Sequence, residues 1–198
     1  MSWATDLIGT WGYLGVILAV ALENLFPPIP SEAVLPFAGF LAARGFLSLP
    51  GAVAAATLGS VLGALVLYHA SRALGRAWIY RVTARWGRYL RLRQEDVEKG
   101  ERWFARHGPS AVFFCRMLPL LRSLISIPAG VAGMRLTTFL LYTAAGTLLW
   151  NAVLIGIGAG LGTAWPVMAT WIAYYEYLIA IAAIGGVVFL GGRLLRRS

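Results

Sequence analysis

Residues 23–32 read Glu-Asn-Leu-Phe-Pro-Pro-Ile-Pro-Ser-Glu, and this stretch decides how the N-terminal part of the chain folds. Pro27, Pro28 and Pro30 end any helix that reaches them, because an interior proline costs about 3 kcal/mol or more. The apolar arm that follows, residues 33–43, has eleven residues. At about 1.5 Å per residue it extends roughly 16 Å, half of a hydrocarbon core about 30 Å thick. The pattern predicts a re-entrant helical hairpin over residues 23–43.

A second broken apolar segment lies at residues 109–134. Pro119 and Pro128 interrupt it, and Arg116 and Arg122 lie within it. Non-helical backbone at membrane depth is tolerated only where it is buried in protein or lines a water-filled cavity. We therefore expect a second re-entrant hairpin here.

The composition is that of a membrane protein. Hydrophobic residues make up 59% of the chain and charged residues 13%, against roughly 25% charged residues in soluble domains. A soluble fold of 198 residues could not bury this much apolar surface in one core. We expect one all-α integral membrane domain over residues 1–198, with the two hairpins and about four transmembrane helices, namely Leu7–Leu22, Leu47–Ala70, Leu136–Gly162 and Val167–Leu190.

The net charge of +9 arises largely in one segment, since ten of the seventeen basic residues lie at 72–106. Loops rich in arginine stay on the cytoplasmic side, so this segment and both termini are predicted to be cytoplasmic. The two hairpins then enter from opposite sides, as in an inverted repeat. Segment 72–106 is expected to be either an amphipathic segment lying on anionic lipid or a solvated connector. Its local clustering of charge argues against nucleic acid as a partner.

Four charged residues in the hairpins are the candidates for chemistry, namely Glu23, Glu32, Arg116 and Arg122. Each would cost about 2.5–3.5 kcal/mol at the bilayer centre, so they must face one another, water or a ligand. We expect the planar guanidinium groups to bind a phosphate and the two acids to couple proton movement. The alternative is a set of internal ion pairs and caps, with Glu32 as a first-turn acid of its own helix.

Three serines near the breaks complete the predicted substrate site, namely Ser31, Ser123 and Ser126. Ser31 and Ser126 precede short helices whose positive ends would point at a bound anion. Asn151 and Tyr68 are expected to support the site through hydrogen bonds between helices.

The remaining small residues predict packing rather than chemistry. One cysteine, Cys115, excludes an internal disulfide and a multi-cysteine metal site, and we expect neither a metal nor a cofactor. Glycines spaced four apart favour close approach of membrane helices, and the chain has them at Gly156, Gly158, Gly160 and Gly162.

The two hairpin motifs resemble those of the DedA family. The first match is the 23–32 run followed by Pro36 and by Ala-Gly-Phe at 38–40. The second is Phe-Cys-Arg-Met-Leu-Pro at 114–119, followed by Arg122, Pro-Ala-Gly at 128–130 and Met134, and Trp-Asn at 150–151 is a third. The resemblance extends from about residue 12 to about residue 162.

The resemblance implies a lipid transporter of the bacterial inner membrane, a flippase or scramblase for undecaprenyl phosphate. It also implies that Glu23, Glu32, Arg116 and Arg122 are needed for activity, and it associates that activity with the proton gradient. Many family members carry an acid where this chain has Ala64. Proton-coupled transport and passive scrambling therefore both stay open, as does the oligomeric state.

Other functions remain as alternatives. Phosphatidylethanolamine or phospholipids in general could be the lipid. A membrane-embedded lipid phosphatase or pyrophosphatase could use paired acids, arginines and Ser123, although no histidine lies near either hairpin tip. The arginines argue against an exporter of small cations, because like charges repel strongly at low dielectric. A purely structural protein would leave the opposed charges unexplained.

Overall fold

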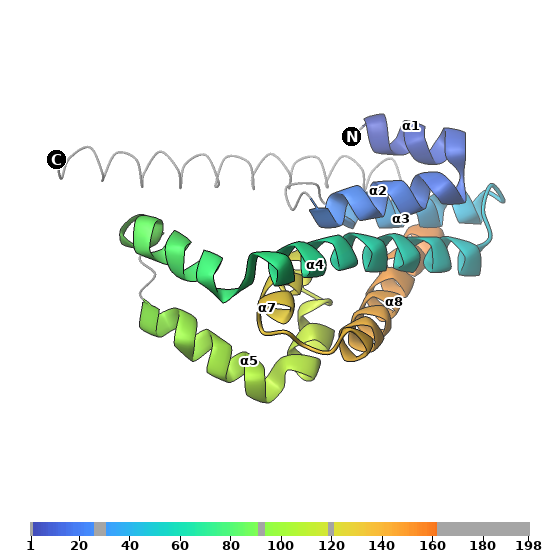
Figure 1. The fold of residues 1–198 in the computed structure, drawn as a ribbon. Helices are drawn as coiled ribbons and strands as arrows, with labels where there is room; N and C mark the ends of the chain where they lie inside the picture. Colours follow the sequence, from blue (N-terminus) through green and yellow to red (C-terminus); the bar gives the residue numbers. More distant parts are fainter. Residues whose placement is uncertain (1, 26–30, 91–93, 119–120, 162–198) are drawn as a thin grey trace.

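The computed structural model describes residues 2–25, 31–90, 94–118 and 121–161, and this part of the chain forms helices without strands (Figure 1). The all-α prediction is therefore confirmed. The helices are α1 (Ser2–Trp11), α2 (Tyr13–Leu25), α3 (Ser31–Ala43), α4 (Leu49–Leu90), α5 (Gln94–Cys115), α6 (Leu121–Leu124), α7 (Ser126–Val131) and α8 (Leu136–Leu161).

The predicted single span over residues 7–22 is wrong. Gly12 has a φ of 55° and separates α1 from α2, which fold back against each other. Gly15 permits this, since a side chain there would collide with the backbone of Leu7 and Ile8. Helix α2 has 13 residues, about 20 Å at 1.5 Å per residue, which is shorter than a hydrocarbon core. The first hairpin is accordingly α2–α3, beginning at Tyr13 rather than at Glu23.

Among the described residues, two helices are long and apolar enough to cross a membrane, Leu49–Ala77 within α4 and Leu136–Leu161, which is α8. They correspond to the predicted spans at 47–70 and 136–162. The fourth predicted span, Val167–Leu190, lies outside the described residues.

The basic connector is helical. Helix α4 continues beyond its apolar part but breaks at Gly75, whose φ of 65° and ψ of −178° are not helical. Its second half and the first half of α5 project together from the rest of the molecule (Figure 1). The described basic side chains here are exposed, among them Arg72, Arg81, Arg102 and Arg106. Several side chains of the predicted amphipathic segment 72–106, such as Trp78 and Trp86, lie outside the described residues.

The helices pack in a reciprocal pattern. We call α2–α3 the N-terminal hairpin, and the end of α5 from Pro109 together with α6 and α7 the C-terminal hairpin. The first arm of each hairpin packs on the long helix that follows it, α2 on α4 and α5 on α8. The second arm of each packs on the long helix of the other half, α3 on α8 and α7 on α4.

Glycine contacts show where each arm packs. Helix α2 runs parallel to α4, since Gly51 meets Tyr13 and Gly63 meets Asn24. Helix α3 crosses α8 in close contact, with Gly39 against Ile155 and Gly158 against Pro36. In the other half, Gly146 of α8 meets Phe113 of α5 and Arg116 just beyond it, and Gly130 of α7 meets Tyr68 and Ser71 of α4. The N-terminal hairpin thus begins beside the first turns of α4 and the C-terminal hairpin ends beside Tyr68 and Ser71, so the two approach from opposite ends of α4. Their described tip residues, Glu23 and Arg122, meet between those ends.

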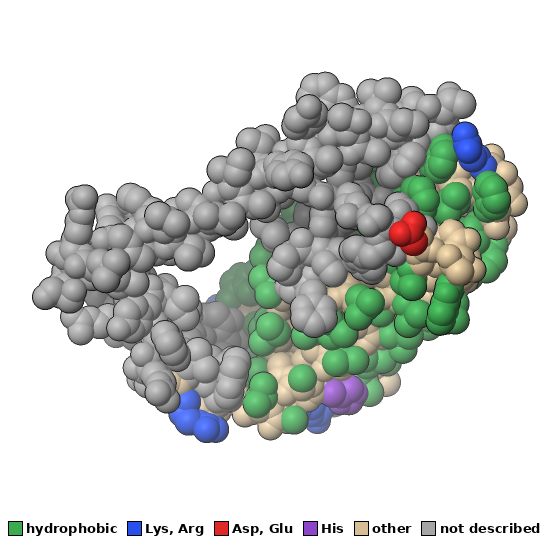
Figure 2. All heavy atoms as spheres, turned by 90° about the horizontal axis from the view of Figure 1, so that it is seen from above, with side chains coloured by type: hydrophobic (Ala, Val, Ile, Leu, Met, Phe, Trp, Pro, Cys, Tyr) green, Lys and Arg blue, Asp and Glu red, His purple; other side chains and the backbone are tan. Residues whose placement is uncertain are grey.

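The outside of the molecule is apolar along the long helices. Exposed large hydrophobic side chains follow the outer faces of α4 and α8, namely Leu58, Leu62, Val66, Leu141, Leu148, Leu149, Val153 and Ile157. Figure 2 shows hydrophobic side chains over much of the described surface, with basic ones near its edges. A continuous apolar exterior of this kind is unfavourable in water and favourable in lipid.

The close contact between α3 and α8 can be tested with neighbouring glycines. Gly158 lies against the Pro36 backbone, whereas Gly156 is exposed, and a methyl group added there would meet no atom of the described chain within 4 Å. We predict that Gly158→Ala costs about 1–3 kcal/mol of stability through overpacking. Gly156→Ala should be neutral or slightly stabilising, because alanine favours the helix.

Thermal or denaturant unfolding of the two variants in detergent measures the difference. Equal stability of Gly158→Ala and Gly156→Ala would contradict the α3–α8 packing described above.

Candidate anion site between the hairpin tips

A buried ion pair joins the two hairpin tips. Glu23 lies near the end of α2 and Arg122 in the short helix α6, ninety-nine positions later. The Arg122 Nη2 group donates a hydrogen bond to Glu23 Oε1, and each side chain is only 3% exposed. The sequence allowed pairing between these opposed charges without naming the partners, and in the structure Glu23 pairs with Arg122.

Arg116 is the largest fully buried side chain of the described chain. It follows the end of α5, where its Nη2 donates to Ser126 Oγ at 2.8 Å and its Nη1 donates to Asn24 Oδ1 at 3.4 Å. Its guanidinium carbon lies 5.9 Å from the centre of the Phe139 ring. Both of these hydrogen bonds to described residues go to neutral groups.

Asn24 is a site residue that the sequence analysis missed. Its side chain is buried, and its Oδ1 accepts hydrogen bonds from Arg116 Nη1 and from Ser123 Oγ, each at 3.4 Å. Its Nδ2 donates to the Val20 carbonyl at 3.1 Å, which fixes the amide orientation. The sequence offered one signal for Asn24, since its amide side chain directly follows Glu23 in an arm that is otherwise apolar.

Several buried polar atoms at the tips have no hydrogen-bond partner within the described chain. Among them are Arg116 Nε, Arg122 Nη1 and Thr143 Oγ1. Thr143 lies on the same face of α8 as Phe139 and Gly146, the residues that contact Arg116. Buried donors without acceptors are rare in folded proteins, because each costs about 1–3 kcal/mol. Two arginine N–H groups thus point to an acceptor that the described chain does not supply.

The predicted serines divide into two groups. Ser123 and Ser126 are buried at the tips and contact Asn24 and Arg116, respectively. The side chains of Ser31 and Glu32 lie outside the described residues, so their predicted roles remain predictions. Among the described residues, no group of three or more His, Cys, Asp and Glu side chains could hold a metal ion.

The two predicted supporting residues lie away from the tips. Asn151 of α8 donates from Nδ2 to Thr57 Oγ1 at 3.3 Å and to Ser60 Oγ at 3.5 Å, which links α8 to α4. Tyr68 is fully buried in α4, and its hydroxyl donates to the Met134 carbonyl between α7 and α8. Both make hydrogen bonds between elements, as expected, and neither is among the side chains around Arg116 and Arg122.

Comparison with known proteins agrees with this arrangement. Residues 29–160 match the VTT domain, which is more than half of the chain. The chain belongs to this family, and it is a DedA-type membrane protein. No solved structure matches it.

Curated relatives carry two kinds of name. "Undecaprenyl phosphate transporter A" of Staphylococcus aureus is 34% identical over 191 residues, which cover 96% of this chain and 94% of the relative. The Bacillus subtilis protein of the same name is 29% identical, covering 93% of this chain and 87% of the relative. An "alkaline phosphatase-like protein" of Lactococcus lactis subsp. cremoris is 47% identical, covering 96% of this chain and 88% of the relative.

The buried ion pair should dominate the stability of the tips. We predict that Glu23→Gln and Arg122→Gln each cost about 3–5 kcal/mol, because each leaves an uncompensated buried charge. The double variant should lose much less than the sum. The exposed pair of Glu98 and Arg102, with an N–O distance of 3.6 Å, provides a control in which Glu98→Gln changes little.

A double-mutant cycle from unfolding in detergent measures this coupling. Additive losses for the two substitutions would mean that Glu23 and Arg122 are not paired in the folded protein.

Proposed function

We propose that this protein moves a phosphate-bearing lipid across the bacterial cytoplasmic membrane, and that the phosphate binds between the hairpin tips. One observation carries the proposal: two arginines are buried together, and only Arg122 is shown paired with a carboxylate, that of Glu23. Within the described residues Arg116 Nε and Arg122 Nη1 have no acceptor. A phosphate offers several anionic oxygens to these donors, and arginine binds it through paired hydrogen bonds.

In this proposal both hairpins are re-entrant and the tips lie near the middle of the bilayer. The approach of the two hairpins from opposite ends of α4 supports this placement. The end of α4 that carries Arg72 and Arg81 faces the cytoplasm, because basic loops are retained there. The C-terminus is proposed to lie on the same side. The predicted cytoplasmic N-terminus relied on a span at 7–22 that the structure divides at Gly12.

The ion pair suggests how binding and proton movement are linked. The incoming phosphate replaces the Glu23 carboxylate at Arg122 while Arg116 supplies a second cation. The displaced Glu23 takes up a proton, because an isolated carboxylate is unstable in an apolar site. When the phosphate leaves, Glu23 loses the proton and pairs with Arg122 again. Glu32 is proposed as a second proton-accepting group, as its place in the same motif suggests.

Undecaprenyl phosphate is the first-choice lipid. The names of the Staphylococcus and Bacillus relatives support it, since both say undecaprenyl phosphate transporter. The single phosphate also suits a site with two arginines and one exchangeable carboxylate. Phosphatidylethanolamine or another phospholipid is the alternative within the same class of transport.

A flipping assay in liposomes tests the proposal. The purified protein is reconstituted with a fluorescent lipid phosphate, and loss of signal to a membrane-impermeant quencher reports movement between leaflets. We predict rapid movement by the wild type and a roughly tenfold or greater loss in Arg116→Gln, from one charge-assisted hydrogen bond. Arg122→Gln and Glu32→Gln should also be slow.

The matched control is Arg81→Gln. Arg81 is exposed in the second half of α4, where its Nε donates to the Ala77 carbonyl, and its loss removes the same charge far from the tips. Wild-type protein that moves no anionic lipid, with or without a pH gradient, would overturn the proposed function.

A lipid phosphatase is the second candidate, favoured by the name of the Lactococcus relative. Arg122 and the adjacent Ser123 could orient a phosphate ester for attack. Release of inorganic phosphate from a lipid phosphate or pyrophosphate, lost in Ser123→Ala, would establish this reaction. We expect no release, and movement of the intact lipid instead.

A further inference from the structure

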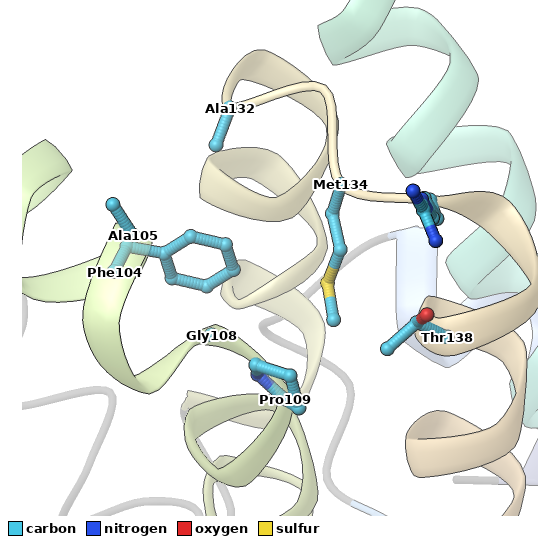
Figure 3. A pocket seen from close by; sticks show the side chains of 8 residues that line it. Phe104, Ala105, Gly108, Pro109, Ala132, Met134 and Thr138 are labelled. Atoms are coloured by element: carbon cyan, nitrogen blue, oxygen red, sulfur yellow. The ribbon is translucent and has the colours of Figure 1, made fainter.

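A pocket lined by apolar and polar side chains lies away from the hairpin tips, between α5 and the start of α8. Its volume is about 220 Å³. The Phe104 ring and the Met134 side chain face each other across it, with Pro109 and Thr138 farther along its walls (Figure 3). The full lining is Phe104, Ala105, Gly108, Pro109, Ala132, Met134, Arg135 and Thr138.

The lining combines apolar walls with one cation. Thr138 and Arg135 are its polar side chains, and Arg135 is exposed rather than held in an ion pair within the described residues. An apolar cavity with one or two polar groups is typical of a small-molecule site, in which the polar groups select the ligand. An arginine beside apolar walls selects an amphiphile with an anionic head.

A second arginine, Arg72, is hydrogen-bonded near the loop between α7 and α8 that lines the pocket. Met134 lines the pocket with its side chain, while its carbonyl accepts the hydrogen bond from Tyr68 Oη. Arg72 Nη1 donates to the same Tyr68 hydroxyl at 2.8 Å. Tyr68 is itself held by stacking on Phe139, with ring centres 4.6 Å apart. Arg72 and Arg135 thus belong to one cationic corner formed by α4 and the loop before α8.

The pocket and the tip site lie at the two ends of helix α7. Helix α7 begins at Ser126, whose hydroxyl accepts from Arg116. It ends at Val131, next to the pocket residue Ala132. Six residues of helix extend about 9 Å, so the two sites are close in space.

We propose that this pocket is a receiving site for a lipid phosphate, in which Arg135 and Arg72 bind the phosphate and the apolar walls hold the first part of the chain. The inference rests on the proposed function, because it adds a site that the lipid occupies before it reaches the tip site. This first site lies on the side of the membrane that carries the basic residues of α4. It assigns Arg135, Arg72 and Thr138 to binding of the lipid before it moves.

Photolabelling with a short lipid phosphate tests the site. A photoreactive farnesyl phosphate is added to the full-length protein in detergent, and labelled peptides are mapped. We expect labelling within residues 104–109 and 132–138. Unlabelled farnesyl phosphate should protect these peptides, whereas farnesol and inorganic phosphate at the same concentration should not.

Two kinds of variant sharpen the result. Arg135→Gln and Arg72→Gln should each weaken protection by farnesyl phosphate roughly tenfold, as expected for a lost charge-assisted hydrogen bond. Ala132→Phe should reduce labelling by filling the pocket, with its melting temperature measured to confirm folding. Arg81→Gln is the control of equal charge and should label like the wild type.

Labelling confined to other peptides, or unchanged by both arginine substitutions, would overturn the receiving site. Protection by inorganic phosphate alone would also overturn it, because the apolar walls would then play no part. The flipping assay separates the two proposals. If the wild type transports lipid, and Arg135→Gln and Arg72→Gln transport it with the same dependence on lipid concentration, the receiving site is excluded and the proposed function is not. Absence of transport in the wild type removes the proposed function, whatever the labelling.

Discussion

Moving a carboxylate and a guanidinium out of water costs several kcal/mol for each ion, so a buried pair survives only if its geometry is fixed from both sides. Glu23 and Arg122 meet this condition, since one comes from each hairpin and both are almost fully buried. The glycine contacts on α4 and α8 fix the arms that carry them. If either hairpin moved away from the centre, one of these charges would face the apolar interior alone.

The surroundings of this pair explain why the site suits an anion. Arg116 adds a second buried cation, which Asn24 and Ser126 orient without compensating its charge. The corner of Arg72 and Arg135 offers a second cationic position at one end of α7. The described part of the chain therefore places positive charge both near the hairpin tips and at one end of the long helices. Apolar surface lies between these two positions and around them.

The sequence predicted the features that depend on local chemistry. Helix α2 ends before the first proline cluster, long apolar runs gave α4 and α8, and the cost of intramembrane charge indicated that the hairpin charges face one another, water or a ligand. It failed where tertiary contact decides. Gly12 divides an apolar run that reads as continuous, and α1 packs back on α2. Asn24 was missed since its role depends on Arg116, a residue ninety-two positions away.

Infrared difference spectroscopy can follow the exchange of partners at Arg122, on which the proposed mechanism depends. Spectra of the reconstituted protein are recorded before and after addition of a lipid phosphate, and Glu23→Gln identifies the Glu23 bands. Binding should remove the Glu23 carboxylate band and produce a protonated carboxyl band, and neither change should occur in the variant. Lipid phosphate that binds while the Glu23 band stays unchanged would contradict this exchange.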